Sequence, residues 1–186
     1  MLTADDPLPL RPQRVVTAGT SGTGKTTLAI RLGEIFDLPH TEIDALFHGP
    51  NWEPRPEFLA DVEALRMSER WITEWNFSDA RDLLAERADL LVWLDLPFRV
   101  TLTRLVRRTV GRRGQELWNG NYEPPLLQAF TDREHVIRWA IRTRHLTAER
   151  VAALRVARPE LTVVRLRSQA EVDRWVASVT RVGQGR

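Results

Sequence analysis

Cysteine is absent from the 186-residue chain, and lysine occurs once, at position 25, among 27 lysines and arginines. Without cysteine the chain has neither disulfide bonds nor thiolate metal ligands, which fits a reducing compartment. No apolar run approaches the roughly 20 residues of a membrane span, and the N-terminus has no apolar signal core. We therefore expect a cytoplasmic, soluble protein with no membrane partner.

Hydrophobic residues make up 42% of the chain, which has no internal repeat or low-complexity segment. A chain of this length can bury roughly two thirds of its unfolded surface in one core. We expect a single domain over residues 13–182. A flexible tail is expected over residues 1–12, which hold three prolines, and a second short tail over 183–186.

The net charge is only +2, but the basic residues are unevenly distributed. Residues 99–158 contain thirteen arginines and five carboxylates. Such a region serves nucleic acid or phosphorylated small molecules, and the count alone does not choose between them. The near-absence of lysine fits a codon bias of the genome, so the one retained lysine is informative.

Strand and helix patterns alternate along the chain. The predicted strands are 14–18, 40–46, 70–75, 89–97 and 161–166. Apolar residues at helical spacing predict helices from Lys25, across 58–65, across 102–109 and across 172–179. Ser168 and Glu171 form a capping box before the last helix. Strands alternating with helices call for a parallel sheet covered on both faces.

The stretch GTSGTGKT at 19–26 fits the phosphate-loop pattern G-x-x-x-x-G-K-[ST] between a predicted strand and a predicted helix. Glycines let successive backbone N–H groups turn toward the phosphates of a nucleotide, and the helix N-terminus adds its positive end. The expected ATP-binding residues are Gly19, Thr20, Ser21, Gly22, Thr23, Gly24, Lys25, Thr26 and Thr27.

Within this loop we expect Lys25 to reach the β- and γ-phosphates and the Thr26 hydroxyl to bind Mg²⁺. A compact ammonium with three rotatable donors suits this position, whereas a planar guanidinium is larger and fixed in shape. This difference explains why lysine is kept here in a chain that otherwise uses arginine.

Acidic residues follow several of the predicted strands, at the sheet edge where ligands of such folds bind. Glu42 and Asp44 are two residues apart on the predicted second strand, so their side chains should point the same way. They would hold an acceptor hydroxyl or a metal-bound water, or else be solvated loop acids. Glu74 and Asp95 end the next two strands, and either could support Mg²⁺; Asp95 could instead cap the helix after Pro97.

Two predicted helices carry basic faces opposite their apolar faces. The first presents Arg104, Arg107 and Arg108, and the second presents Arg138, Arg142 and His145. These are ordinary solvated faces or phosphate-binding residues that close over the site. Between them, residues 111–134 have the turn-rich composition of a lid, or of a plain long loop. The four histidines are too scattered for a metal site, and only Trp52 and Trp118 lie where a ring could stack on a ligand.

Seven stretches resemble, in order, the small bacterial phosphate-loop proteins similar to adenylate kinase that are often labelled DNA topology modulation proteins. They are GTSGTGKTTLA, EIDALFHGPNW, RWITEWNF, ADLLVWLDLP, RLVRRT, ELWNGN and IRWAIRT, and the resemblance covers about residues 14–178. Members usually show D-G-N-Y where this chain has Glu74-Trp75-Asn76-Phe77. The longer acid and the bulky Trp75 bear on the role of Glu74 and on the size of the acceptor pocket.

The resemblance implies an α/β, three-layer P-loop NTPase fold like that of nucleoside monophosphate kinases. It implies a five-stranded parallel sheet in the order 2-3-1-4-5 with a helical lid over about 111–134. By the same resemblance, residues 19–27 bind ATP and Asp44 faces the acceptor. Arg104, Arg108, Arg138 and Arg142 look like phosphate clamps.

The leading hypothesis is a kinase that transfers the γ-phosphoryl group of ATP·Mg²⁺ to a small acceptor. The acids of the second strand suit a small alcohol, whereas the arginines suit a nucleoside monophosphate. The competing class is a nucleotide-dependent regulator that binds DNA, which the basic region would support although no recognition helix is evident. A plain ATPase, with water as the acceptor, is the third possibility. The acceptor, the oligomeric state and the pathway stay open.

Overall fold

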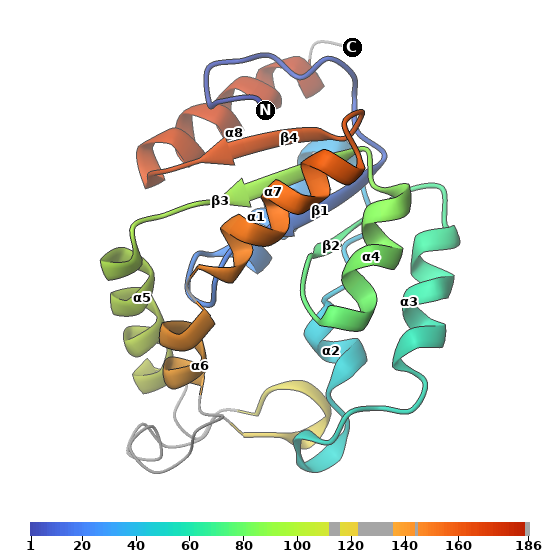
Figure 1. The fold of residues 1–186 in the computed structure, drawn as a ribbon, viewed down its shortest axis with the longest axis vertical. Coiled ribbons are helices and arrows are strands. Elements are labelled where there is room, and N and C mark those ends of the chain that lie inside the picture. Colours follow the sequence, from blue (N-terminus) through green and yellow to red (C-terminus); the bar gives the residue numbers. More distant parts are fainter. Residues whose placement is uncertain (112–115, 123–135, 144, 185–186) are drawn as a thin grey trace.

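The computed structural model of the protein describes residues 1–111, 116–122, 136–143 and 145–184. For 136–139 and 182–184 it describes the backbone alone. Four parallel strands form one sheet within these ranges, with β1 at Arg14–Ala18, β2 at Trp71–Glu74, β3 at Leu90–Leu94 and β4 at Thr162–Leu166. The strand order across the sheet is β2-β1-β3-β4 (Figure 1).

Helices connect the strands and follow the last one. They are α1 (Lys25–Phe36), α2 (Ile43–Phe47), α3 (Phe58–Met67), α4 (Ser78–Arg87), α5 (Phe98–Gly111), α6 (Val136–Thr143), α7 (Leu146–Ala157) and α8 (Gln169–Gln184). Two single turns of 3₁₀-helix, η1 (Pro50–Trp52) and η2 (Trp118–Gly120), lie in the loops. Across the described ranges, no helix has both the length and the apolarity that crossing a bilayer requires.

The expected five-stranded sheet is wrong by one strand. In place of a strand over 40–46, the structure has a single parallel bridge between His40 and Ile72, beside β2. The chain then turns into α2, because Ile43, Leu46 and Phe47 have helical spacing and pack together into the core beneath the sheet. The other four predicted strands are confirmed.

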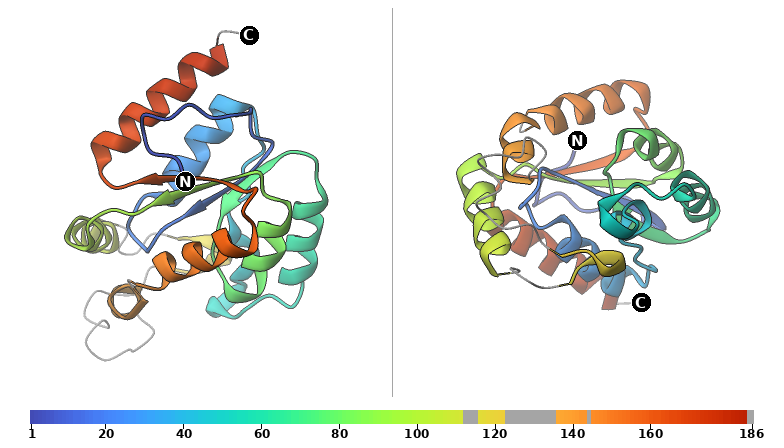
Figure 2. Two further views of the ribbon diagram at one scale, coloured as in Figure 1. Left: turned by 45° about the horizontal axis from the view of Figure 1, so that its top comes forward. Right: turned by 90° about the horizontal axis from the view of Figure 1, so that it is seen from below.

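The sheet is buried between two layers of helices, as an all-parallel sheet requires. Helices α1 and α8 cover one face, and α2, α3, α4 and α7 cover the other (Figure 2). Register places Thr17 beside Glu74 and Ala18 beside Trp93, so the carboxyl ends of β1, β2 and β3 meet at one edge. The predicted phosphate loop leaves β1 at this edge.

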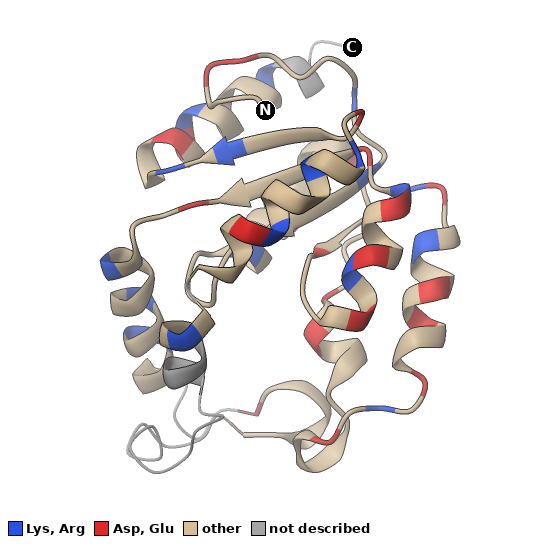
Figure 3. Cartoon of the chain, viewed as in Figure 1, with Lys and Arg blue, Asp and Glu red and all other residues tan. Residues whose placement is uncertain are grey.

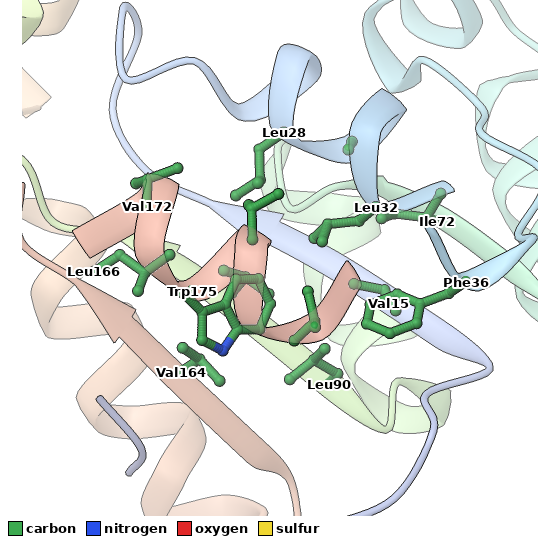
Figure 4. Packing of buried hydrophobic residues seen from close by; sticks show 14 of the residues in the cluster. Val15, Leu28, Leu32, Phe36, Ile72, Leu90, Val164, Leu166, Val172 and Trp175 are labelled. Carbon is green, nitrogen blue, oxygen red and sulfur yellow. The ribbon is translucent and has the colours of Figure 1, made fainter. Parts of the chain in front are cut away.

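Helix α8 shows how local sequence signals become packing. Glu171 N–H donates to Ser168 Oγ at 3.2 Å, while the Glu171 carboxylate accepts from the N–H of Arg167 rather than from that of Ser168. The predicted capping box is therefore present with its return bond shifted by one residue. The helix buries Trp175 completely against β4 (Figure 4). Burying roughly 150–250 Å² of ring surface at about 25 cal/mol per Å² contributes roughly 4–6 kcal/mol, and the buried Nε1, which has no hydrogen-bond partner among the described residues, offsets part of this.

Residues 1–12 differ from the loose tail that their composition suggested. Leu2 N–H donates to the Val163 carbonyl at 2.7 Å, and Arg165 N–H donates to the Leu2 carbonyl at 2.9 Å. Ala4 is buried and Leu8 packs against the same core as α8. The N-terminal segment thus pairs with the outer edge of β4, an edge that would otherwise present unpaired backbone groups.

Candidate nucleotide and acceptor site

The predicted phosphate loop runs from the end of β1 to the start of α1, and its shape requires glycine. Gly22 and Gly24 have φ angles of 86° and 94°, in the left-handed region. A Cβ on Gly22 would lie 2.4 Å from the carbonyl oxygen of Thr101 on α5. The loop therefore packs directly against α5, and no side chain fits at this position.

The N-terminus of α1 is open to a ligand. Gly24 is its N-cap, makes no side-chain capping bond, and has nothing within 4 Å of the position a Cβ would take. The first N–H groups of such a helix lack helical partners, and the helix dipole gives this end a positive character. The loop behind it is braced by Thr23, whose hydroxyl donates to the Thr20 carbonyl at 2.8 Å. Residues 19–27 therefore suit the phosphates of a nucleotide.

Lys25 lies half-buried beneath this loop, and its Nζ donates to the Thr20 carbonyl at 3.2 Å. Burial lowers the pKa of Lys25, and the carboxylates of Asp44 and Glu74 act in the opposite direction. Both acids are therefore close enough to Lys25 to interact with its charge. The structure thus brings together the loop lysine and two acids that lie in separate segments of the sequence.

Glu74 ends β2 and is 1% exposed. Burial acts to raise its pKa, but hydrogen bonds from His40 and from the N–H of Ile43 outweigh it, so the pKa of Glu74 is lowered. The His40 Nε2 lies 3.3 Å from one carboxylate oxygen, and the Ile43 N–H donates to the other at 3.2 Å. The Thr26 hydroxyl acts in the same direction. Glu74 is therefore an ionised acid beside the predicted magnesium ligand.

The two acids considered for magnesium have different surroundings. Asp95 forms a salt bridge with Arg165, whose Nε donates to Asp95 at 2.8 Å and whose guanidinium lies 4.6 Å from the centre of the Trp93 ring. Glu74 instead interacts with Thr26 and Lys25. The geometry therefore favours Glu74 over Asp95 as the acid beside the metal.

The residues near Thr26 fit a nucleotide-bound magnesium ion. The Thr17 hydroxyl, adjacent to Glu74 in the sheet register, is buried and has no hydrogen-bond partner within the described ranges. Among the described residues, no group of three or more acids and histidines could hold a metal by itself. Magnesium that arrives on phosphates keeps several waters and needs only one or two protein ligands, so Thr26 with Glu74 is sufficient.

Asp44 lies on α2 rather than on a strand, and Glu42 is the N-cap residue of that helix. The expectation that both side chains point the same way along a strand is therefore wrong. Burial raises the pKa of Asp44 to about 6; Lys25 and Arg108 oppose this rise, and Glu74 and Glu42 add to it. Asp44 is thus a half-buried carboxylate whose proton affinity is set near neutrality.

Of the four arginines expected to clamp phosphate, Arg108 is exposed on α5 and its charge acts on this site. Its charge lowers the pKa of both Lys25 and Asp44. Arg104, one turn earlier on α5, donates from Nη2 to the side chain of Gln169 at 2.8 Å, and thereby joins α5 to the start of α8. Arg142 is exposed on α6, next to α5, while the side chain of Arg138 lies outside the described part of the chain.

Three half-buried rings, His48, Trp52 and Trp118, form what we call the aromatic wall. The rings of His48 and Trp118 are nearly parallel, with centroids 6.0 Å apart and an interplanar angle of 21°. Trp52 is close to perpendicular to both, 5.1 Å from His48 and 6.2 Å from Trp118. The sequence pointed to both tryptophans as stacking platforms but not to His48, which follows Asp44 by one helical turn.

Hydrogen bonds of Asn121 hold the aromatic wall together. Asn121 is 4% exposed, donates to the carbonyls of Gly49 at 2.8 Å and Trp118 at 2.9 Å, and accepts from the N–H of Trp52 at 2.9 Å. The Asn119 amide also donates to the His48 carbonyl. Residues 116–122 therefore lie along η1 (Figure 1). The rest of the predicted lid, 112–115 and 123–134, lies outside the described residues.

The backbone around the aromatic wall is unusually strained. Among the described residues other than glycine, five have positive φ angles, and four of them border this region: Asn51, Trp52, Phe77 and Asn119. Such conformations cost of order 1–3 kcal/mol each and persist only where the surroundings enforce them, commonly at functional sites. Phe77 illustrates the enforcement, because its ring stacks on Phe47 with centroids 3.9 Å apart.

Trp75, the bulky residue of the Glu74-Trp75-Asn76-Phe77 stretch, is buried in the core on the α4 side of the sheet. Its Nε1 donates to the Arg81 carbonyl at 2.9 Å. The ring is therefore part of the packing beneath α4.

Charge is unevenly distributed around the site. Arginines lie on α5 and on the described part of α6, whereas α2, α3 and α4 together carry six acids and three arginines (Figure 3). The phosphate loop lies between these two groups of helices. A cavity of about 410 Å³ opens beside Thr20 and is lined by the end of β3 and the start of α7, with Phe98 and Arg167. A larger cavity of about 550 Å³ lies at the opposite ends of the strands, near Arg14 and Asp89.

No protein-family model and no curated protein sequence matches this chain. Solved structures do match. A shikimate kinase from Bacteroides thetaiotaomicron has a TM-score of 0.53 at 12% identity, covering 92% of this chain and 98% of its own. A sugar kinase from Janibacter sp. HTCC2649 has a TM-score of 0.50 at 19% identity, and a shikimate kinase from Acinetobacter baumannii in complex with shikimate has 0.50 at 15%. Each of these two covers 91% of this chain and 92% of its own.

These likenesses show that the chain has a P-loop kinase-like fold. At identities below 25% they show the fold alone, and what these kinases act on is a separate question. The resemblance to DNA topology modulation proteins stays a prediction.

Proposed function

We propose that this protein is a kinase that transfers the γ-phosphoryl group of ATP to a hydroxyl group of a small molecule. The observation that carries the proposal is the interaction between Lys25 of the phosphate loop and Asp44 of α2, each of which shifts the pKa of the other. Lys25 would bind the phosphoryl group that moves, and Asp44 would meet the acceptor beside it. No covalent intermediate is needed.

Residues 19–27 would hold the phosphates of ATP through backbone N–H groups, Lys25 and the open end of α1. Thr26 would bind magnesium directly, and ionised Glu74 would hold a water of the metal. Magnesium would supply neutralisation of the charge on the β- and γ-phosphates. Arg108 is the clamp that the geometry supports best, and we expect Arg104, Arg138 and Arg142 to reach the phosphates only if the nucleotide or a closure of the site brings them there.

Asp44 would act as the general base. Its carboxylate accepts the proton of the acceptor hydroxyl, the hydroxyl oxygen forms a bond to the γ-phosphorus, and the bond from that phosphorus to the bridging oxygen of ADP breaks. A pKa of about 6 leaves Asp44 mostly ionised at neutral pH while keeping its proton affinity high. Burial, the main cause of the raised pKa, also keeps the carboxylate out of bulk water.

A small alcohol is the acceptor class that the fold comparison supports. The solved structures of similar fold include kinases of sugars and of shikimate. A nucleoside monophosphate would instead need cations on the acceptor side, where acids outnumber arginines on α2, α3 and α4 (Figure 3).

The experiment is an acceptor screen that measures ADP release from ATP·Mg²⁺ and identifies the phosphorylated product. The panel holds sugars, sugar acids, shikimate, nucleosides and nucleoside monophosphates. A kinase shows acceptor-dependent ADP release and a phosphorylated product, both lost in Asp44→Asn. ADP release that no acceptor increases would show a plain ATPase. Duplex DNA binding with steep salt dependence and no product from any acceptor would show a regulator.

A further inference from the structure

We propose, building on the kinase function above, that the acceptor is an uncharged hydroxylated ring compound that lays one face of its ring on the aromatic wall. The wall is His48, Trp52 and Trp118. In this arrangement a hydroxyl of the ring meets Asp44, and the ring itself is recognised by stacking. The acceptor class is then restricted to uncharged ring compounds, and the aromatic wall, held in place by Asn121, determines which of them bind.

Helix α2 relates the wall to the reacting end of the site. Asp44 and His48 are four residues apart, and the His48 N–H donates to the Asp44 carbonyl at 3.0 Å, so the helical turn is complete between them. Side chains at this spacing lie on one helix face with Cβ atoms about 5–6 Å apart. A six-membered ring spans this separation, so a molecule whose hydroxyl contacts Asp44 reaches His48.

Specific hydrogen bonds and backbone conformations hold the three rings of the aromatic wall together. Trp118 reaches it from another part of the chain through the three hydrogen bonds of Asn121, and Trp52 holds a positive φ of 62° to join it. Its three rings remain half-buried instead of entering the core. Clustered, partly exposed aromatic rings held in strained backbone mark a binding surface more than a packing solution.

The wall is also uncharged. Burial lowers the pKa of His48, and a backbone hydrogen bond with Trp52 only partly opposes this, so the imidazole is neutral. A neutral ring system suits stacking against the face of a sugar or a nucleoside.

The charges nearest to the acceptor position argue against an anion. Glu42 and Glu74 raise the pKa of Asp44, and the two cations that lower it, Lys25 and Arg108, are those that the proposed function assigns to the phosphates of ATP. Arg55, the cation next to Gly49, is already engaged: it donates to the Leu46 carbonyl at 3.1 Å and pairs with Asp61 at 3.0 Å. A carboxylate or phosphate on the acceptor would therefore meet like charges.

The test compares pairs of ring compounds that differ mainly in an anionic group: methyl shikimate with shikimate, adenosine with AMP, and glucose with glucuronate. Binding to the full chain is measured by isothermal titration calorimetry with Mg²⁺ and the non-hydrolysable β,γ-imido analogue of ATP. The variants are Trp118→Ala, Trp118→Phe and Asn121→Ala. Tyr122→Ala is the matched control, because Tyr122 is an exposed aromatic residue on the same segment.

We expect at least one uncharged member to bind at least tenfold more tightly than its anionic partner. Trp118→Ala and Asn121→Ala should weaken that binding at least tenfold, whereas Trp118→Phe and Tyr122→Ala should stay within about threefold of the original protein. Nucleotide affinity should be the same in all five proteins, which also shows that the variants are folded.

Tighter binding of the anionic members, no binding of any uncharged member, or an unchanged affinity in Trp118→Ala would overturn the inference. Phosphorylation of the bound compound is followed separately by ³¹P NMR with ATP. An uncharged compound that binds the aromatic wall but is never phosphorylated would refute the kinase function and support the wall as a binding site. An anion that is phosphorylated equally well by the original protein and by Trp118→Ala would refute the role of the aromatic wall and support the kinase function.

Discussion

Replacing Asn121 by alanine should release η2 from η1 without unfolding the protein. The substitution removes two hydrogen bonds between the segments, to the Gly49 carbonyl and from the Trp52 N–H, and one within the η2 segment, to the Trp118 carbonyl, at distances of 2.8–2.9 Å. Each such bond contributes about 0.5–1.5 kcal/mol net, and the partners left behind are partly desolvated. We therefore expect the docking of the two segments to weaken by roughly 2–4 kcal/mol, or about 30- to 1000-fold.

Amide hydrogen exchange measured by NMR isolates this effect. The Trp52 amide, which donates to Asn121, should exchange at least about 30-fold faster in Asn121→Ala. The amide of Val16, a fully buried residue of β1, should stay within about twofold, because the sheet does not depend on Asn121. Tyr122→Ala, on the same segment, should change neither rate. Unchanged exchange at Trp52 in Asn121→Ala would show that the segments are held by something other than this side chain.

Four further changes test the nucleotide side. Lys25→Arg should abolish turnover and leave the circular dichroism spectrum intact, because the loop accommodates an ammonium rather than a guanidinium; turnover near the original rate would contradict this. Glu74→Gln should raise the magnesium concentration needed for half-maximal turnover about tenfold, with no change if Glu74 does not hold the metal. Gly22→Ala should lower the melting temperature and abolish nucleotide binding, because its Cβ would lie 2.4 Å from the Thr101 carbonyl. Burial raises the pKa of Asp44 from 3.8 to about 6, so ionising Asp44 in the fold costs free energy, and stability falls as pH rises between these values. Asp44→Asn should remove this fall in the free energy of unfolding, which is at most about 3 kcal/mol. Denaturant titrations at pH 4 and 8 measure it, and the same pH dependence in both proteins would contradict the reasoning.

The parts of the fold that the sequence predicts are those with local causes. The apolar run of β1, the glycines that follow it and the helical spacing from Lys25 lie within about twenty residues of one another, and each element appears as predicted. The same holds for α8, where Ser168 caps the helix and Trp175 lies on its buried stripe. Such signals need no distant partner.

The parts that the sequence does not predict depend on contacts between distant segments. Asn121 bonds to a carbonyl 72 residues away, and Arg165 pairs with an acid 70 residues away, so neither partner could be named in advance. At 40–46, the alternation of strands and helices along the chain suggested a strand. Ile43, Leu46 and Phe47 fit a helix equally well, and packing beneath the sheet decides for the helix.

The central claim is that this site moves the γ-phosphoryl group of ATP to a hydroxyl group. The most direct measurement uses ATP labelled in the γ-phosphoryl group, with magnesium and the uncharged ring compounds, and follows the label into a stable phosphate ester. The account predicts a labelled ester whose formation rises with pH through about 6 and is lost in Asp44→Asn, while that variant still binds ATP. Label that appears only as inorganic phosphate with every acceptor, or an ester formed equally well by Asp44→Asn, would contradict it.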